Sequence, residues 1–168
     1  MFRADIAAIR DIKGRVLPFL FPHLFAVAMY RLSSALRARR LVRSARVVAI
    51  IGQLLTGAEL APEAEIGPGL FLCHTTGVIV GPGVIAGARL RLFSGALLGS
   101  TFNDSGSKRP ELGFPTIGDD VLVLAKASIL GPVIVGDRAV IGAHALVLDD
   151  VPADAVARGI PAKSFPRQ

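Results

Sequence analysis

Aliphatic residues recur at every sixth position in long runs of this chain, with small and polar residues between them. The recurring positions are Leu60, Ile66, Leu72, Val80, Ala86, Leu92, Leu98, Ile117, Val123, Ile129, Val135, Ile141 and Val147. A period of six fits neither the 3.6-residue turn of an α-helix nor plain alternation along a strand. It is typical of a parallel β-helix, in which three hexads complete one coil of a triangular prism and the recurring side chains stack inside it.

Glycine often follows the recurring aliphatic residue, as in Ile66-Gly67 and Val135-Gly136. At the corners of a prism the backbone needs a positive φ or a close approach to the next coil, and glycine meets both needs. We therefore expect these glycines at the corners. Ordinary strands joined by glycine turns are the alternative, but they do not explain so many aliphatic positions in phase.

Two interruptions break the period, and insertions in a repeat usually form loops on its functional face. The first adds two residues at 74–77. The second covers residues 100–116, which are rich in Asn, Asp, Ser, Gly and Pro and carry Lys108 and Arg109 near their centre. This composition predicts an extruded loop, and a loop of this length is more often functional than not.

The first third of the chain has a different pattern, which predicts helices. Residues 16–29 are too short an apolar run to span a bilayer, and the positive charges that follow them do not suit a signal peptide. From Tyr30 to Leu55 the apolar residues have the spacing of an amphipathic helix. We expect helices that pack on the end of the β-helix or on a neighbouring subunit. Peripheral contact between residues 16–55 and an anionic membrane surface is the alternative.

Length and composition agree with one β-helix domain, residues 58–168, preceded by a helical segment, residues 1–57. The chain has 168 residues, of which 52% are hydrophobic, and this is enough for a sizeable core. The single cysteine, Cys73, excludes a disulfide framework within the chain and favours a reducing, cytoplasmic setting. The net charge of +6 is concentrated in residues 31–46 without a nucleic-acid-binding motif, so an anionic small molecule or a membrane surface is the better partner.

The candidate chemistry lies at the first interruption of the period. His74 breaks an aliphatic run, and a histidine in such a place is as often structural as catalytic. Glu59 lies fifteen positions upstream of His74, a separation close to one coil of the prism. Its carboxylate is then placed to hold one imidazole nitrogen and leave the other free to take a proton from a hydroxyl group. The pair therefore indicates general-base catalysis.

From Gly57 to Phe165 the chain resembles the serine acetyltransferase branch of the left-handed β-helix acyltransferases. The resemblance rests on the segments GAELAPEAEIGPGLFLCHTTGVIVG, LLGS, FPTIGDDVLVLAKASILGPVIVGDRAVIGAHALVLDDVP and GIPAKSF. It implies a mainly β fold, a left-handed parallel β-helix, and an O-acetyltransferase with acetyl-CoA as co-substrate and no metal. His74 matches the family's general base, and Glu59 matches its acidic partner, which is usually Asp. Members are homotrimers with coenzyme A between neighbouring prisms, so the resemblance implies active sites at subunit interfaces.

The same resemblance implies which residues hold coenzyme A. Backbone N–H groups of the LLGS segment are candidates for an oxyanion hole, small residues of the late coils for contact with pantetheine, and basic side chains for the phosphates. The predicted coenzyme A residues are Gly99, Ser100, Ala125, Lys126, Ala143, Arg158 and Lys163. A solvated surface charge is the alternative for each basic residue, and His144 is expected on the surface.

Departures from the family pattern concern the acceptor. The family's aspartate before the catalytic histidine is here Cys73, and its second histidine is here Phe114. Both changes remove polar groups that would recognise an amino acid, so the predicted acceptor is a hydroxyl of a non-serine small molecule or a sugar. The predicted substrate-side residues are Cys73, Lys108, Arg109 and Phe114. Packing alone is the alternative for Cys73, because neighbours on a strand face opposite ways.

The sequence therefore predicts an acyl-CoA-dependent acyltransferase, and an O-acetyltransferase in particular. A serine O-acetyltransferase proper and a non-catalytic trimeric assembly module are the alternatives. A metal-dependent hydratase of the carbonic-anhydrase type shares the fold, but it needs three histidine ligands, and His23, His74 and His144 are too scattered to supply them. An amine acceptor and a longer acyl donor are variants of the main prediction.

Overall fold

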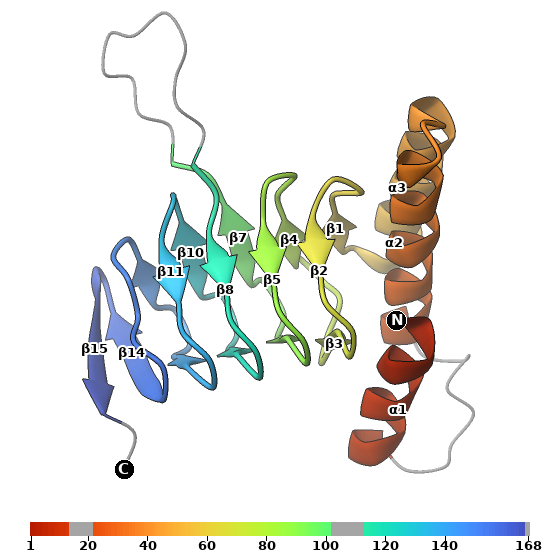
Figure 1. Cartoon of the computed structure of the whole chain (residues 1–168). Coiled ribbons are helices and arrows are strands. Elements are labelled where there is room, and N and C mark those ends of the chain that lie inside the picture. Colours follow the sequence, from red (N-terminus) through yellow and green to blue (C-terminus); the bar gives the residue numbers. More distant parts are fainter. Residues whose placement is uncertain (14–21, 102–112, 167–168) are drawn as a thin grey trace, which may run out of the picture.

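Short strands follow the six-residue period and form a prism with helices across its N-terminal end (Figure 1). The computed structural model describes residues 1–13, 22–101 and 113–166. The helices are α1 (Phe2–Lys13), α2 (Pro22–Ala38) and α3 (Val42–Thr56). No continuous helix covers the span from Tyr30 to Leu55, because the chain turns at residues 39–41, where Arg40 has a φ of +63°.

Three sheets form the faces of the prism, and successive coils each add a strand to them. Sheet A consists of β1 (Glu59–Leu60), β4 (Ile79–Val80), β7 (Leu97–Gly99), β10 (Ser128–Leu130) and β13 (Leu146–Val147). Sheet B consists of β2 (Glu65–Ile66), β5 (Ile85–Ala86), β8 (Thr116–Ile117) and β11 (Ile134–Val135). Sheet C consists of β3 (Phe71–Leu72), β6 (Arg91–Leu92), β9 (Leu122–Val123), β12 (Val140–Ile141), β14 (Ala155–Gly159) and β15 (Ala162–Pro166). The pairs are parallel except for the antiparallel β14 and β15.

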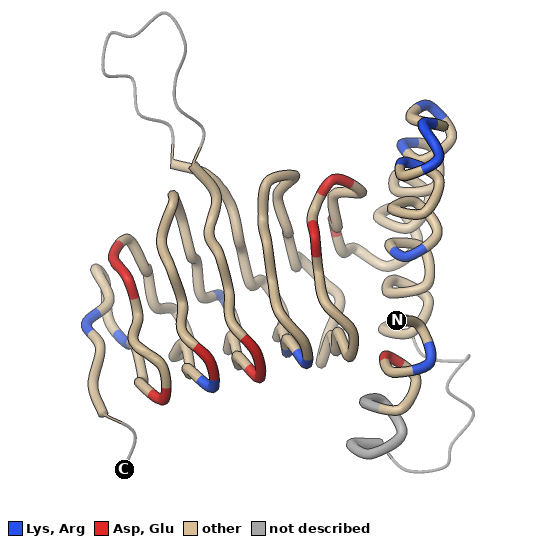
Figure 2. The backbone as a smooth tube through the Cα atoms, viewed as in Figure 1, with Lys and Arg blue, Asp and Glu red and all other residues tan. Residues whose placement is uncertain are grey.

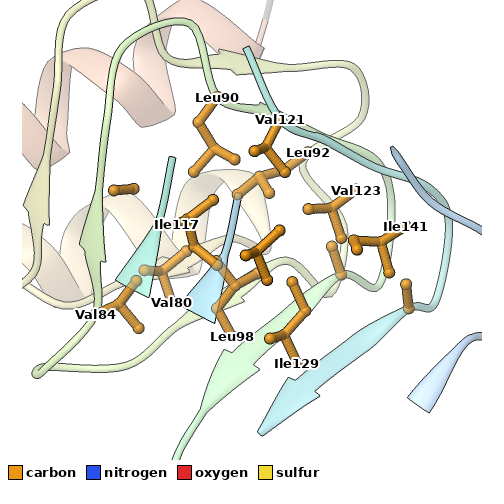
Figure 3. Packing of buried hydrophobic residues seen from close by; sticks show 14 of the residues in the cluster. Val80, Val84, Leu90, Leu92, Leu98, Ile117, Val121, Val123, Ile129 and Ile141 are labelled. Atoms are coloured by element: carbon orange, nitrogen blue, oxygen red, sulfur yellow. The ribbon is translucent and has the colours of Figure 1, made fainter. Parts of the chain in front are cut away.

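The register places each recurring aliphatic residue over its counterpart in the preceding coil. In sheet A, Val80 pairs with Leu98, and Ile129 pairs with Val147. Every recurring position named above is buried, with no side chain more than 7% exposed. Figure 3 shows part of the buried cluster, which also contains residues between the recurring positions, such as Val84, Leu90 and Val121. The predicted parallel β-helix is therefore confirmed, and the recurring residues lie in its core as the period predicts.

Except for Gly99, the glycines that follow the recurring residues serve close approach rather than a positive φ. A Cβ atom on Gly67 would lie 2.6 Å from the carbonyl carbon of Gly87 in the next coil. No backbone can accept that contact, so the coils could not stack at their normal spacing with a side chain there. Positive φ values fall on other turn residues, among them Lys126 and His144. The corner prediction is correct, and steric contact between coils is its physical cause.

A buried carboxylate attaches α1 to the first coil. Asp5 is completely buried and accepts hydrogen bonds from the backbone N–H groups of Gly69 at 2.7 Å and Leu70 at 2.9 Å. It also forms an ion pair with Arg31 of α2, with 2.9 Å between Nε and the carboxylate oxygen. One carboxylate therefore joins two helices and a turn of the β-helix.

A buried phenol attaches α2 to the same coil. The Tyr30 hydroxyl donates to the carbonyl oxygen of Ala64 at 2.7 Å and accepts from the N–H of Ile66 at 3.2 Å. Burial of the ring raises the pKa of Tyr30 above its ordinary value. The two bonds satisfy backbone groups that would otherwise lie unpaired under the helices.

Helix α3 packs on α2 through small residues. Its buried residues are Ala45, Gly52 and Thr56. A Cβ atom on Gly52 would lie 2.9 Å from Cβ of Met29, so the two helices approach closely at this point. The helix ends at Gly57, which has a φ of +74° and donates its N–H to the carbonyl of Gln53, the left-handed cap that glycine favours.

Candidate active site

One edge of the prism carries most of the predicted site. We call the turns that lead from sheet C to sheet A the C–A edge, and they comprise residues 73–77, 93–95, 124–126 and 142–144. Backbone N–H groups of Gly95, Lys126 and His144 each donate to a carbonyl of the preceding turn, at 3.0, 2.8 and 3.0 Å. These bonds hold the turns one above another, so side chains on the edge form a line along the prism.

His74 lies on the C–A edge in its first turn, and its imidazole is exposed. Glu59 approaches the same edge from sheet A, because the N–H of Gly77 donates to the carbonyl of Gly57 at 2.9 Å and so stacks the two turns. Within the described residues no hydrogen bond joins Glu59 to His74. The fifteen-residue separation thus brings the pair to one edge, and the contact expected between them is not made within a single protomer.

A neighbour that the hexad pattern does not reveal contacts Glu59. The side-chain N–H of Gln53, in the last turn of α3, donates to Oε2 of Glu59 at 3.0 Å. Gln53 precedes the first hexad and belongs to a helix, so no repeat signal marks it. Next to this bond, a groove of about 380 Å³ runs between α3 and the first coils, and both side chains line it.

The basic residues predicted for coenzyme A lie on the same edge as His74. Lys126 is part of the edge, and Ala125 and Ala143 are small residues in its turns. Arg158 continues the line, because a Cβ atom on Gly142 would lie 3.3 Å from Cβ of Arg158. Lys163 pairs with Arg158 across the β14–β15 ladder. With about 4.8 Å between coils, His74 and these two terminal cations are roughly 20 Å apart.

Three other predicted residues lie at the opposite edge of sheet A. We call the turns from sheet A to sheet B the A–B edge, and Gly99 and Ser100 lie there, at the end of β7. Phe114 lies on this edge too, and its ring covers two glycines. A Cβ atom on Gly81 would lie 2.8 Å from Cε1 of Phe114, and one on Gly83 would clash with the same ring. A single protomer therefore does not bring Gly99, Ser100 or Phe114 to His74.

Cys73 packs against the helices. It is half-buried and contacts a small apolar cluster that contains Leu24 and Phe71, with Phe2 and Ile6 alongside. This placement agrees with the packing alternative for Cys73. Lys108 and Arg109 lie outside the described residues.

The third edge of the prism gathers charges away from His74. Figure 2 shows acidic and basic residues along the turns from sheet B to sheet C. There Arg89 donates to both carboxylate oxygens of Asp120, each at 2.6 Å, and this lowers the pKa of Asp120. Arg138 makes the same contacts with Asp154. No group of three or more His, Cys, Asp or Glu residues suited to a metal ion occurs in the described ranges 1–13, 22–101 and 113–166.

Comparison with known proteins defines the class of the chain. Residues 114–149 match the family described as bacterial transferase hexapeptide (six repeats). A serine acetyltransferase of Helicobacter pylori is 38% identical over 146 residues, which are 87% of this chain and 82% of that protein. The crystal structure of Neisseria gonorrhoeae serine acetyltransferase superposes with a TM-score of 0.88 at 30% identity, covering 99% of this chain and 64% of that one. A serine acetyltransferase structure in complex with CoA gives a TM-score of 0.86 at 28% identity, covering 98% of this chain and 68% of that one.

These findings define a hexapeptide-repeat transferase built on a left-handed β-helix with N-terminal helices, as the sequence predicts. The chain belongs to the serine acetyltransferase family, and its activity is that of an acetyltransferase. For the acceptor, the named relatives favour the serine alternative over the non-serine acceptor that the sequence predicted.

Proposed function

We propose that this chain is an acetyl-CoA-dependent serine O-acetyltransferase. The observation that carries the proposal is the C–A edge, which has an exposed imidazole at one end and the cations Arg158 and Lys163 at the other. An elongated thioester with phosphates at its far end is complementary to this arrangement. Its phosphates would meet the two cations when its thioester lies at the imidazole. The named relatives are serine acetyltransferases, and one such structure holds CoA, which supports this donor and acceptor.

In the proposed reaction His74 acts as general base. It accepts the proton of the acceptor hydroxyl as that oxygen attacks the thioester carbon, an assistance worth roughly 10²- to 10⁴-fold. The imidazolium then gives its proton to the departing CoA thiolate as the tetrahedral intermediate collapses. Glu59 stabilises the imidazolium by its charge, and Gln53 limits the positions that the carboxylate can take.

The two edges of sheet A support a homotrimer with shared sites. His74 lies on the C–A edge, whereas the candidate oxyanion donors at Gly99 and Ser100 lie on the A–B edge. The two sets complete one site when the C–A edge of one protomer faces the A–B edge of its neighbour, and a threefold rotation repeats that contact three times. Neither edge alone encloses a thioester.

Mixed trimers test the shared site. His74→Ala removes the base from one edge, and Ser100→Pro removes a backbone N–H from the other. If sites are shared, an equal mixture of the two inactive chains should recover activity at about a quarter of the sites. Each site then takes its C–A edge from one protomer and its A–B edge from the next, and each of these edges is intact in about half of the chains. If the two halves serve within one protomer, the mixture stays inactive.

A second acceptor class is favoured by two specific side chains. Cys73 is half-buried in an apolar cluster, and the ring of Phe114 covers glycines on the A–B edge. Neither offers a charge to the ammonium or carboxylate of an amino acid. An uncharged hydroxyl acceptor, such as a sugar, is therefore the second candidate.

The deciding experiment measures CoA thiol release from acetyl-CoA, first with L-serine and then with a panel of sugars and other alcohols. Binding of acetyl-CoA is measured in parallel by calorimetry. His74→Ala should abolish release and leave binding intact. Glu59→Gln removes the charge proposed to stabilise the imidazolium and should lower release. Glu65→Gln is its matched control and should leave release unchanged, because Glu65 holds the same place before its buried hexad residue but lies on sheet B.

Each outcome selects one function. Release with L-serine that depends on His74 supports the serine acetyltransferase. Release with another alcohol alone supports the second candidate. Absence of acetyl-CoA binding overturns both and leaves the non-catalytic assembly module.

A further inference from the structure

Helix α3 presents its large apolar side chains to solvent, which is the reverse of an ordinary helix on a soluble protein. Its buried residues are small, while Val47, Ile51, Leu54 and Leu55 are 55%, 42%, 78% and 66% exposed. Spacings of three and four residues place them on one side of the helix. We call these four residues the outer face of α3. A continuous exposed apolar face of this kind marks an interaction surface.

Unpaired positive charge borders the outer face. From residue 12 to residue 58 the sequence has no Asp or Glu, and residues 31–46 contain six Arg. Figure 2 shows basic residues on α2 and α3, gathered at the tip of the hairpin that they form.

The six arginines divide into two groups. Arg31 pairs with Asp5, and Arg37 and Arg46 lie 3.5 and 3.7 Å from Glu63, so these three are directed at the prism and α1. The other three are exposed, and no carboxylate of the described residues pairs with them. They are Arg39, Arg40 and Arg43.

Apolar side chains beside unpaired cations fit an anionic lipid surface. The apolar side chains enter the boundary between headgroups and acyl chains, and the arginines meet the lipid phosphates. No helix among the described residues is long and apolar enough to cross a bilayer, so the contact is interfacial. A symmetric contact between the hairpins of two copies fits less well, because it would bring Arg39, Arg40 and Arg43 against the same arginines of the second copy.

We infer that the α2–α3 hairpin docks the protein on anionic bilayers through the outer face of α3 and Arg39, Arg40 and Arg43. The inference is independent of the acceptor and of the catalytic role of His74. Each arginine near the surface should strengthen binding about fivefold at low salt. Docking would place the β-helix beside the bilayer with its C–A edge unaltered.

Vesicle cosedimentation of the full-length protein tests the inference. The vesicles are phosphatidylcholine alone, or phosphatidylcholine with phosphatidylserine as one third of the lipid. We expect binding to the anionic vesicles only, weakened by salt. Arg39→Ala/Arg43→Ala should lower binding at least tenfold. The matched control is Arg3→Ala/Arg91→Ala, which removes the same charge from exposed sites on α1 and β6 and should bind normally.

A second variant separates the lipid surface from self-association. Leu54→Ser should weaken vesicle binding and leave the sedimentation velocity of the free protein unchanged. The inference is overturned if the two double variants lose vesicle binding equally, or if the unmodified protein does not bind anionic vesicles at low salt. It is also overturned if Leu54→Ser changes the oligomeric state, because the outer face then joins copies of this chain.

Discussion

Replacing Asp5 with alanine should weaken the attachment of the helices to the β-helix. The buried carboxylate accepts N–H bonds from Gly69, Leu70 and two nitrogens of Arg31. Asp5→Ala leaves two backbone donors and a guanidinium without that acceptor in a site shielded from water. Breaking a buried ion pair on one side costs about 3–5 kcal/mol. Because Arg31 keeps its bonds to the carbonyls of Ile66 and Gly67, we expect about 3 kcal/mol, at the lower end.

Urea unfolding followed by circular dichroism measures this loss, and a fall in Tm of about 10 °C should accompany it. Asp154→Ala is the control. Asp154 is hydrogen-bonded to Arg138 at 2.6 Å, which is shorter than any hydrogen bond to Asp5, but both side chains are more than half exposed. Asp154→Ala should lower the free energy of unfolding much less than Asp5→Ala does, since solvent screens an exposed ion pair. Equal losses at the two sites, or a loss at Asp5 below about 1 kcal/mol, would refute the argument that burial sets the cost.

Three further predictions test the fold and the site. Tyr30→Phe removes the bonds to Ala64 and Ile66 and should cost about 1–2 kcal/mol in urea unfolding, so an unchanged midpoint contradicts it. Gly67→Ala should cost about 1–3 kcal/mol through its clash with the next coil, whereas Gly99→Ala, whose nearest neighbour would be 3.6 Å away, should cost far less. Gln53→Ala should lower kcat about two- to tenfold at unchanged KM for acetyl-CoA and unchanged stability, and Gln53→Glu should lower it further by repelling Glu59. Normal kcat in both Gln53 variants would show that the bond does not position Glu59.

The β-helix could be predicted because the residues that carry its period are all buried in its core. Each recurring aliphatic residue, such as Leu72 or Val123, is buried because the coils stack. The same pattern occurs at thirteen positions of the sequence, so the signal is strong. The break between α2 and α3 could not be predicted in the same way. Apolar spacing continues through residues 39–41, and the turn depends on Arg40 adopting a positive φ that its residue type does not favour.

The candidate site could be predicted only in part. His74 and Lys126 lie on one edge because hexads repeat in threes, so the sequence places residues of equal phase in line. Gln53 lies outside the repeat, and only the packing of α3 on the first coil brings it to Glu59. The environment of Cys73 also depends on helices that the period does not describe.

In the proposed shared site, the position of Phe114 separates part of donor recognition from the acceptor. Of the residues proposed for acetyl-CoA, Ala125, Lys126 and Ala143 lie in turns of the C–A edge, which backbone bonds between coils hold in place. Phe114 lies on the A–B edge, where its ring packs on Gly81 and Gly83. A substitution at Phe114 is therefore expected to change the shape and polarity that an acceptor meets and to leave those three residues in place. Under this proposal, the lack of a polar group at Phe114 bears on the acceptor, whereas His74 bears on acetyl transfer.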